Sequence, residues 1–88
     1  MLSSKQCEIA RTMTQDNISD LQIIQEYEMF NDLLKPSAVN EIDNLLKQHD
    51  APFDKAFKTM VKDFSIIANK YSISPSTLFC IYMDNKSK

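Results

Sequence analysis

The sequence predicts an all-α fold, a compact bundle of four to five short helices that forms one domain over residues 1–88. The chain contains no glycine, although about six would be expected at the usual frequency of roughly 7%. Tight β-hairpin turns need positive φ angles, which glycine adopts most easily, so hairpins are disfavoured. Apolar residues also recur at helical spacing in several segments, and Ser or Pro stands at the start of most of them.

The first predicted helix spans residues 4–13 and is capped by Ser3 or Ser4. Its apolar face is narrow, because it consists of Cys7, Ala10 and Met13. Helices this short are marginally stable alone. Residues 1–18 are therefore expected either to dock on the rest of the bundle or to be flexible.

The second predicted helix spans residues 20–34, with Ser19 as its N-cap. We expect it to end at Lys35, because a residue that precedes proline is pushed out of the helical region. Its apolar stripe follows helical spacing and consists of Leu21, Ile24, Tyr27, Phe30 and Leu34.

Two further helices are predicted in the middle of the chain. Ser37 is expected to cap a helix over residues 38–48, whose stripe is Val39, Ile42, Leu45 and Leu46. The longest predicted helix spans residues 52–71 and starts with proline, a residue favoured in the first turn. Its apolar face runs over five turns and consists of Phe53, Phe57, Met60, Val61, Phe64, Ile67, Ala68 and Tyr71.

The last predicted helix spans residues 75–84, with Ser74 as N-cap and Pro75 in the first turn. Its second half, residues 78–83, contains six consecutive apolar residues. A helix that is apolar all round is buried on most sides or lies at an interface. The same run could form a strand, but no other segment alternates in a way that would provide a partner strand, so a helix is favoured.

Several classes of function are disfavoured by the composition. Phosphate-binding loops and the standard EF-hand loop both need glycine, so neither is expected. Cysteine and histidine are the usual ligands of transition metals, and this chain contains Cys7, Cys80 and His49. Their spacing does not match that of a metal site. His49 and Asp50 are interpreted as loop residues rather than an acid–base pair, and Cys80 as a small hydrophobe with a raised pKa. We therefore expect neither an enzyme nor a cofactor or metal.

The sequence also predicts a cytoplasmic, intracellular protein with no membrane association. It has no apolar run of about 18 residues, and residues 1–11 lack the apolar core of a signal peptide. Two distant cysteines in a reducing compartment are expected to be free thiols. The net charge of −2 is unevenly distributed, because residues 1–50 carry −5 and residues 51–88 carry +3.

Residues 64–83 contain Ala68 on a first predicted helix, Ile73 in the short turn after it, and Leu78 and Ile81 on a second helix, and in this they resemble helix-turn-helix regulators. Ala68 stands where the two helices must approach closely, Ile73 where the turn directs an apolar residue inward, and Leu78 and Ile81 at packing positions of the second helix. Ser72 occupies the turn position that usually favours glycine, which is a departure from the pattern. The resemblance implies a C-terminal corner of two helices and, in one reading, contact with DNA.

The outward residues of the second helix do not favour the reading of bases, which relies on Arg, Lys, Asn and Gln. A DNA-binding regulator would instead contact phosphates through Lys70, Ser76, Thr77, Lys86 and Lys88. An apolar ridge of Phe79 and Met83, supported by Tyr82, suits protein contact better than DNA contact, and the alternative is that Phe79 and Met83 belong to the core.

The main hypothesis is accordingly a small regulator or adaptor that docks this ridge on a partner protein, with a role in transcription as one option. The alternatives are a DNA-binding helix-turn-helix regulator, which could be a homodimer, and an inhibitor that masks the active surface of its partner. The acidic first half of the chain would orient the protein on such a partner and raise the association rate.

Overall fold

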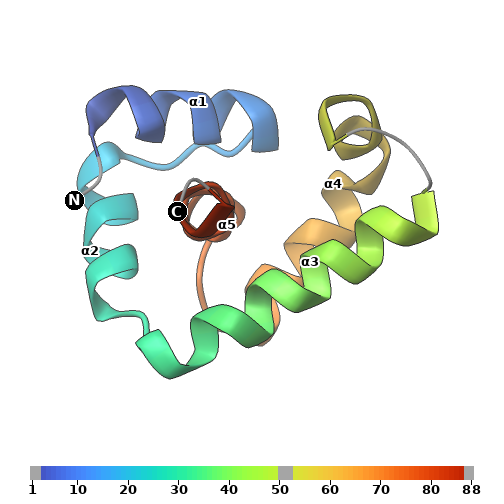
Figure 1. Cartoon of the computed structure of the whole chain (residues 1–88). Coiled ribbons are helices and arrows are strands. Elements are labelled where there is room, and N and C mark those ends of the chain that lie inside the picture. The colour runs from blue at the N-terminus through green and yellow to red at the C-terminus, as the bar shows by residue number, and fades with distance from the viewer. Residues whose placement is uncertain (1–2, 50–52, 87–88) are drawn as a thin grey trace.

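Five α-helices and a short 3₁₀ helix form the part of the chain that the computed structural model describes, residues 3–49 and 53–86 (Figure 1). Side chains are described for residues 3–48 and 61–85. In chain order the elements are α1 (Ser4–Thr14), α2 (Asp20–Met29), η1 (Asp32–Leu34), α3 (Lys35–His49), α4 (Phe53–Lys70) and α5 (Pro75–Lys86). These ranges contain no strand, so the predicted all-α class is confirmed.

Helix α5 lies at the centre of the bundle. Figure 1 shows it end-on, with α1 and α2 on two sides and α3 and α4 on the others, and it packs against all four. Residues 76–82 are all buried, so five of the six residues in the apolar run 78–83 belong to the interior and Met83 is exposed; the run is helical, as favoured from the sequence. The apolar core comprises Cys7, Ala10, Ile23, Phe30, Ala38, Val39, Ile42, Phe64, Ala68, Leu78, Phe79, Cys80, Ile81 and Tyr82.

Serine caps begin three of the helices as the sequence predicts. Ser3 forms a capping box with Gln6, in which the Ser3 hydroxyl accepts from the Gln6 backbone N–H at 3.2 Å and the Gln6 amide oxygen accepts from the Ser3 N–H at 2.9 Å. Ser19 accepts from the Gln22 N–H at 3.2 Å. Ser74 accepts from the Thr77 N–H at the same distance, so each cap satisfies a donor that the helix leaves unpaired.

The connection between α2 and α3 differs from the prediction. Helix α2 ends at Met29 rather than at residue 34, because Phe30 adopts an extended backbone and turns into the core. The Asn31 side chain then accepts from the Leu33 N–H at 2.9 Å and starts η1. Pro36 lies in the first turn of α3, where proline is tolerated, so it begins a helix instead of ending one. The predicted Ser37 cap is wrong for the same reason.

The turn between α4 and α5 is a Schellman motif built without glycine. The Ile73 N–H donates to the Ala68 carbonyl and the Ser72 N–H to the Asn69 carbonyl, both at 3.1 Å. Ser72 has a φ of 60°, in the left-handed region that favours glycine. The position that the sequence singled out as glycine-like therefore adopts that conformation, and Ala68 is fully buried at the close approach of the two helices.

All three tyrosines of the chain hydrogen-bond to a carboxylate on another helix. The pairs are Tyr27 with Asp84 at 2.6 Å, Tyr82 with Asp43 at 3.0 Å, and Tyr71 with Glu41. Burial and the bond to Asp43 raise the pKa of Tyr82 to about 12, and burial followed by the bond to Asp84 raises the pKa of Tyr27. The Tyr27–Asp84 and Tyr82–Asp43 pairs fix the C-terminal half of α5 to α2 and α3. Helices α1 and α4 lie against the other side of α5.

The radius of gyration of 11.9 Å agrees with the value of about 12 Å expected for a compact chain of this length. Each of the helices within the described ranges is too short or too polar to cross a lipid bilayer. Short helices are marginally stable alone, so the packing of amphipathic helices around α5 is the main source of order in the described part of the bundle.

Candidate functional site

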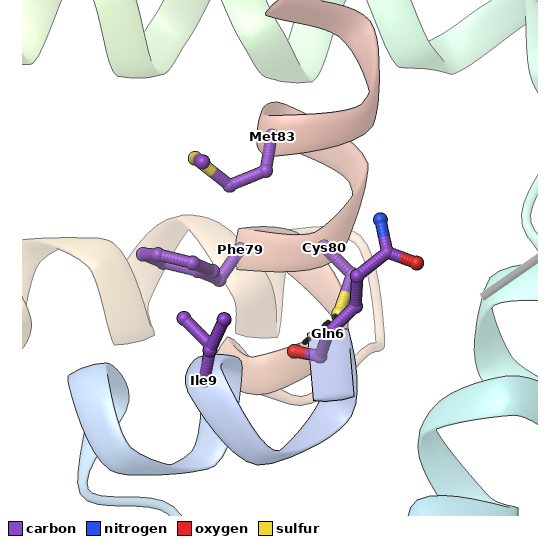
Figure 2. A pocket seen from close by; sticks show the side chains of 5 residues that line it. All are labelled: Gln6, Ile9, Phe79, Cys80 and Met83. Carbon is purple, nitrogen blue, oxygen red and sulfur yellow. Dashed lines mark hydrogen bonds between the residues drawn. The ribbon is translucent and has the colours of Figure 1, made fainter. Parts of the chain in front are cut away.

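An apolar groove opens between α1 and α5. Figure 2 shows the Phe79 ring between Ile9 of α1 and Met83 one turn further along α5, with Gln6 and Cys80 at the side. The groove has a volume of about 230 Å³. Ile9 is 45% exposed and Met83 44% exposed, whereas Phe79 is only 3% exposed. The groove therefore has two accessible walls and a largely buried aromatic floor.

The floor and the Gln6 side of the groove are fixed by packing and capping. Phe79 makes an edge-to-face contact with Phe64 of α4, with ring centroids 6.5 Å apart, which is a favourable aromatic geometry. The Gln6 side chain is held by the capping box with Ser3. The backbone carbonyl oxygen of Gln6 lies 4.0 Å from the Cys80 sulfur, and this weak hydrogen bond from the thiol joins α1 to α5. This side of the groove is therefore formed before any ligand arrives.

The thiols beside the groove are suited to packing rather than to chemistry. Burial, with a smaller contribution from the neighbouring Cys7, raises the pKa of Cys80 to about 12, and burial also raises that of Cys7. Both thiols are free and buried. A thiol with so high a pKa is protonated at neutral pH and is a poor nucleophile. The prediction that Cys80 acts as a small hydrophobe with a raised pKa is confirmed.

The predicted interface ridge is only partly at the surface. Phe79 and Tyr82, 3% and 6% exposed, belong to the core, so their placement on an exposed ridge is wrong. The physical reason is that α5 is enclosed by four helices, and periodicity within one helix cannot reveal how many neighbours surround it. Met83 is the exposed member of the predicted set, and Phe79 reaches solvent only as the floor of the groove.

Two of the predicted DNA contacts are buried polar residues of the core. Ser76 and Thr77 are fully buried at the N-terminal end of α5, so they are not available to phosphates. The Ser76 hydroxyl donates to an Asp16 carboxylate oxygen at 3.1 Å, and the Thr77 hydroxyl donates to Glu26 at 2.7 Å. Ser76 also shares a hydrogen bond of 3.0 Å with Thr14. These residues join α5 to α1, α2 and the connection between them.

Glu26 is the main acceptor at this end of α5. Its carboxylate receives hydrogen bonds from the Thr77 hydroxyl, from the Ser74 backbone N–H at 2.9 Å and from Gln22 at 3.2 Å. Burial raises the pKa of Glu26, but these hydrogen bonds together outweigh it and lower the pKa below the usual value of 4.5. The carboxylate is thus charged at neutral pH and stabilises the helix terminus that it faces.

The remaining predicted DNA contacts are lysines. Lys70 is exposed and forms an ion pair with Glu41 at 2.9 Å, and the hydrogen bond to that carboxylate raises the pKa of the lysine. The side chain of Lys86 and all of Lys88 lie outside the described residues. Lys70 is accordingly the only one of the five predicted phosphate contacts that the described residues place at the surface.

The residues that could bind a metal do not converge in the described part of the chain. No group of three or more His, Cys, Asp or Glu residues within it could hold a metal ion. His49 is the last residue of α3, so its interpretation as a loop residue is wrong, and its side chain and Asp50 lie outside the described residues. Every buried side-chain N or O atom of the described residues has a hydrogen-bond partner, so none of these side chains offers an unsatisfied polar atom to a ligand.

The chain matches no protein-family model, no curated protein and no solved structure. The resemblance to helix-turn-helix regulators therefore stays a prediction, and a functional assignment depends on the surface features described above.

Ile9 and Gln6 are groove residues that the sequence did not identify. Ile9 lies outside the helix face formed by Cys7 and Ala10. An isoleucine outside the buried face must either be exposed or make another contact, and this position was the only sign in the sequence that Ile9 belongs to a surface site. Gln6 could be predicted as a capping-box residue, three positions after Ser3, but not as part of a groove. Only the docking of α1 on α5 brings these residues to Phe79 and Met83.

Proposed function

We propose that this protein is a non-catalytic interaction module, a small regulator or adaptor, that binds an apolar side chain of a partner protein in the α1–α5 groove. The observation that carries the proposal is the pair of half-exposed apolar walls, Ile9 and Met83, on either side of the Phe79 ring. Exposed apolar side chains that surround a concavity are typical of sites where another molecule excludes water.

The size of the groove favours a side chain over a free small molecule. Sites for drug-sized ligands usually measure roughly 300–1,000 Å³ and bury most of the ligand. A groove of about 230 Å³ that opens to solvent is smaller than this range. It is matched to one large aliphatic or aromatic side chain presented by the surface of a partner, which would cover Ile9 and Met83 at the same time.

A tagged protein in a native lysate, with bound partners identified by mass spectrometry, provides the test. The wild-type protein is compared with Ile9→Ser and Met83→Ser, and Leu21→Ser is the matched control because Leu21 is 66% exposed on α2 and does not line the groove. We expect a stoichiometric protein partner to be lost in both groove variants and retained in the control. Circular dichroism on each variant confirms that the fold is intact.

Nuclease treatment of half of each sample separates this proposal from the alternatives. A partner that survives nuclease and depends on Ile9 and Met83 supports the adaptor or inhibitor role, and the identity of the partner distinguishes these two. Partners that are all lost with nuclease, or that bind the groove variants as well as the wild-type protein, would overturn the proposal.

A further inference from the structure

A second apolar surface lies at the corner where α2 passes into η1. Met29 and Leu33 are each 85% exposed, and Leu34 is 41% exposed. These residues, together with Glu28, are called the α2–η1 corner. A groove of about 260 Å³ runs between this corner and the turn after α4, and Met29, Leu34 and Tyr71 line it. None of its lining residues belongs to the α1–α5 groove.

Local structure holds these side chains outward. Phe30 leaves the helix, is 8% exposed and packs edge-to-face on Tyr71 with ring centroids 5.9 Å apart, so it anchors the corner to the turn after α4. Asn31 caps η1 through its bond to the Leu33 N–H, which fixes the backbone at Leu33. Since the core contact is made by Phe30, Met29 and Leu33 do not pack in the interior. Two large apolar side chains are thus exposed next to a rigid aromatic anchor.

The charge around the corner is negative. Residues 20–34 contain four carboxylates and no basic residue. Two of these are compensated, because Asp20 pairs with Arg11 and Asp32 lies 3.0 Å from Lys35. Glu26 has no cationic partner among the described residues, and exposed Glu28 makes no ion pair with them. Glu26 lines the groove but is partly buried and hydrogen-bonded to Thr77 and Ser74, so Glu28 is the exposed carboxylate without an ion pair that accompanies the exposed apolar side chains.

We propose that the α2–η1 corner binds a basic amphipathic segment of another protein. Apolar side chains of that segment cover Met29 and Leu33 and enter the groove beside Leu34, and its Lys or Arg residues face Glu28 and Glu26. Charge complementarity identifies this occupant, because an acidic amphipathic segment would be repelled by the same carboxylates. Methionine suits such a surface, since its flexible thioether adapts to different apolar partners. Together with the α1–α5 groove, this surface gives the chain two separate docking sites.

The test uses a short amphipathic peptide of leucine and lysine as the probe and a leucine–glutamate peptide of the same pattern as the control. Binding to the full chain is measured by fluorescence anisotropy and located by backbone chemical shifts in NMR. We expect the leucine–lysine peptide to shift the signals of residues 28–34 and 71–73, to bind more weakly as salt rises, and to bind at least about tenfold more tightly than the control peptide.

Variants separate the corner from the other groove. Leu33→Ser and Met29→Ser should each weaken binding of the leucine–lysine peptide about tenfold, because each removes apolar surface whose burial contributes about that factor to the affinity. Glu28→Gln should weaken it less and reduce the salt dependence. Ile66→Ser, at a 63% exposed position outside both grooves, and Ile9→Ser, within the other groove, should leave it unchanged. Circular dichroism on each variant confirms folding.

Three results would overturn the proposal. Equal affinity for the two peptides would show that charge does not select the partner, and shifts confined to Ile9 and Met83 would place the peptide in the α1–α5 groove. A dimer in sedimentation equilibrium that Leu33→Ser dissociates would identify a second copy of the chain as the occupant. Equal affinity for the two peptides, or a dimer, would leave the proposed role of the α1–α5 groove untouched, because the test of that groove depends on partner loss in Ile9→Ser and Met83→Ser.

Discussion

The two ends of α5 reverse the usual relation between polarity and burial. At the N-terminal end, Ser76 and Thr77 are polar and fully buried, because Asp16 and Glu26 accept their hydrogen bonds. Further along the same helix, Met83 is apolar and 44% exposed. The difference teaches that burial follows from the partners that neighbouring helices provide, since a polar residue with satisfied hydrogen bonds can be buried at little cost.

Replacement of the aromatic floor should have the largest effect. We expect Phe79→Ala to lower the free energy of unfolding by about 3–5 kcal/mol, the usual range for a phenylalanine removed from a core. The physical reasons are its 3% exposure and its contact with Phe64. Urea unfolding followed by circular dichroism measures the change, with Phe79→Leu as a milder control. A loss below about 1 kcal/mol would mean that the floor of the groove is not part of the core.

Removal of the charge at the polar end should have the next largest effect. Glu26→Gln is expected to destabilise the fold by about 2 kcal/mol, because hydrogen bonds to a charged acceptor contribute roughly 1.5–3 kcal/mol. Glu28→Gln is the matched control, since Glu28 is exposed on the same helix and its replacement should change stability by no more than about 0.5 kcal/mol. Equal values for the two variants in urea unfolding would contradict the role assigned to the buried network.

The Glu26 carboxylate should make the free energy of unfolding depend on pH. Hydrogen bonds hold the pKa of Glu26 below 4.5 in the folded state despite its burial, and the Tyr71 and Lys70 bonds do so for Glu41. Since a lowered folded pKa favours the charged form, this contribution is complete above about pH 4.5 and is lost as pH falls through the folded pKa values. Urea midpoints from pH 6 to pH 3 should fall, and less steeply for Glu26→Gln. If the urea midpoint of Glu26→Gln falls with pH as steeply as that of the wild-type protein, Glu26 does not contribute to the pH dependence.

The turn before the polar end should tolerate a change that stabilises it. Ser72 has a φ of 60°, which costs a residue with a Cβ atom more than it costs glycine. Ser72→Gly is expected to raise the free energy of unfolding by up to about 1 kcal/mol, because relief of that strain exceeds the added entropy of the unfolded chain. The matched variant Ser72→Ala should not stabilise the protein. Thermal unfolding of the three proteins distinguishes these cases.

The groove wall should have the smallest effect on stability. Met83→Ser is expected to change the free energy of unfolding by less than about 1 kcal/mol, since the side chain is nearly half exposed. Its contrast with Phe79→Ala, one turn away, sharpens the distinction between the wall and the floor. If Met83→Ser unfolds the protein as readily as Phe79→Ala does, Met83 is a core residue and the groove is not a binding surface.

The sequence by itself determined the helices and most of their ends. The absence of glycine, the helical spacing of apolar residues and the caps at Ser3, Ser19 and Ser74 are local features, so one segment at a time suffices to recognise them. The α2–α3 connection is the exception, because Phe30 leaves its helix to contact Tyr71, which is distant in sequence. Its extended backbone therefore depends on tertiary packing rather than on local propensity.

Only the tertiary structure decided which residues are accessible. The number of helices around α5 determines that Phe79 and Tyr82 are buried, that Ser76 and Thr77 are internal, and that Met83 meets Ile9 across a groove. Periodicity assigns one face of a helix to the core, but α5 has neighbours on four sides. Since exposure is a property of the whole assembly of helices, the binding surfaces of this protein could not be read from the segments that contribute to them.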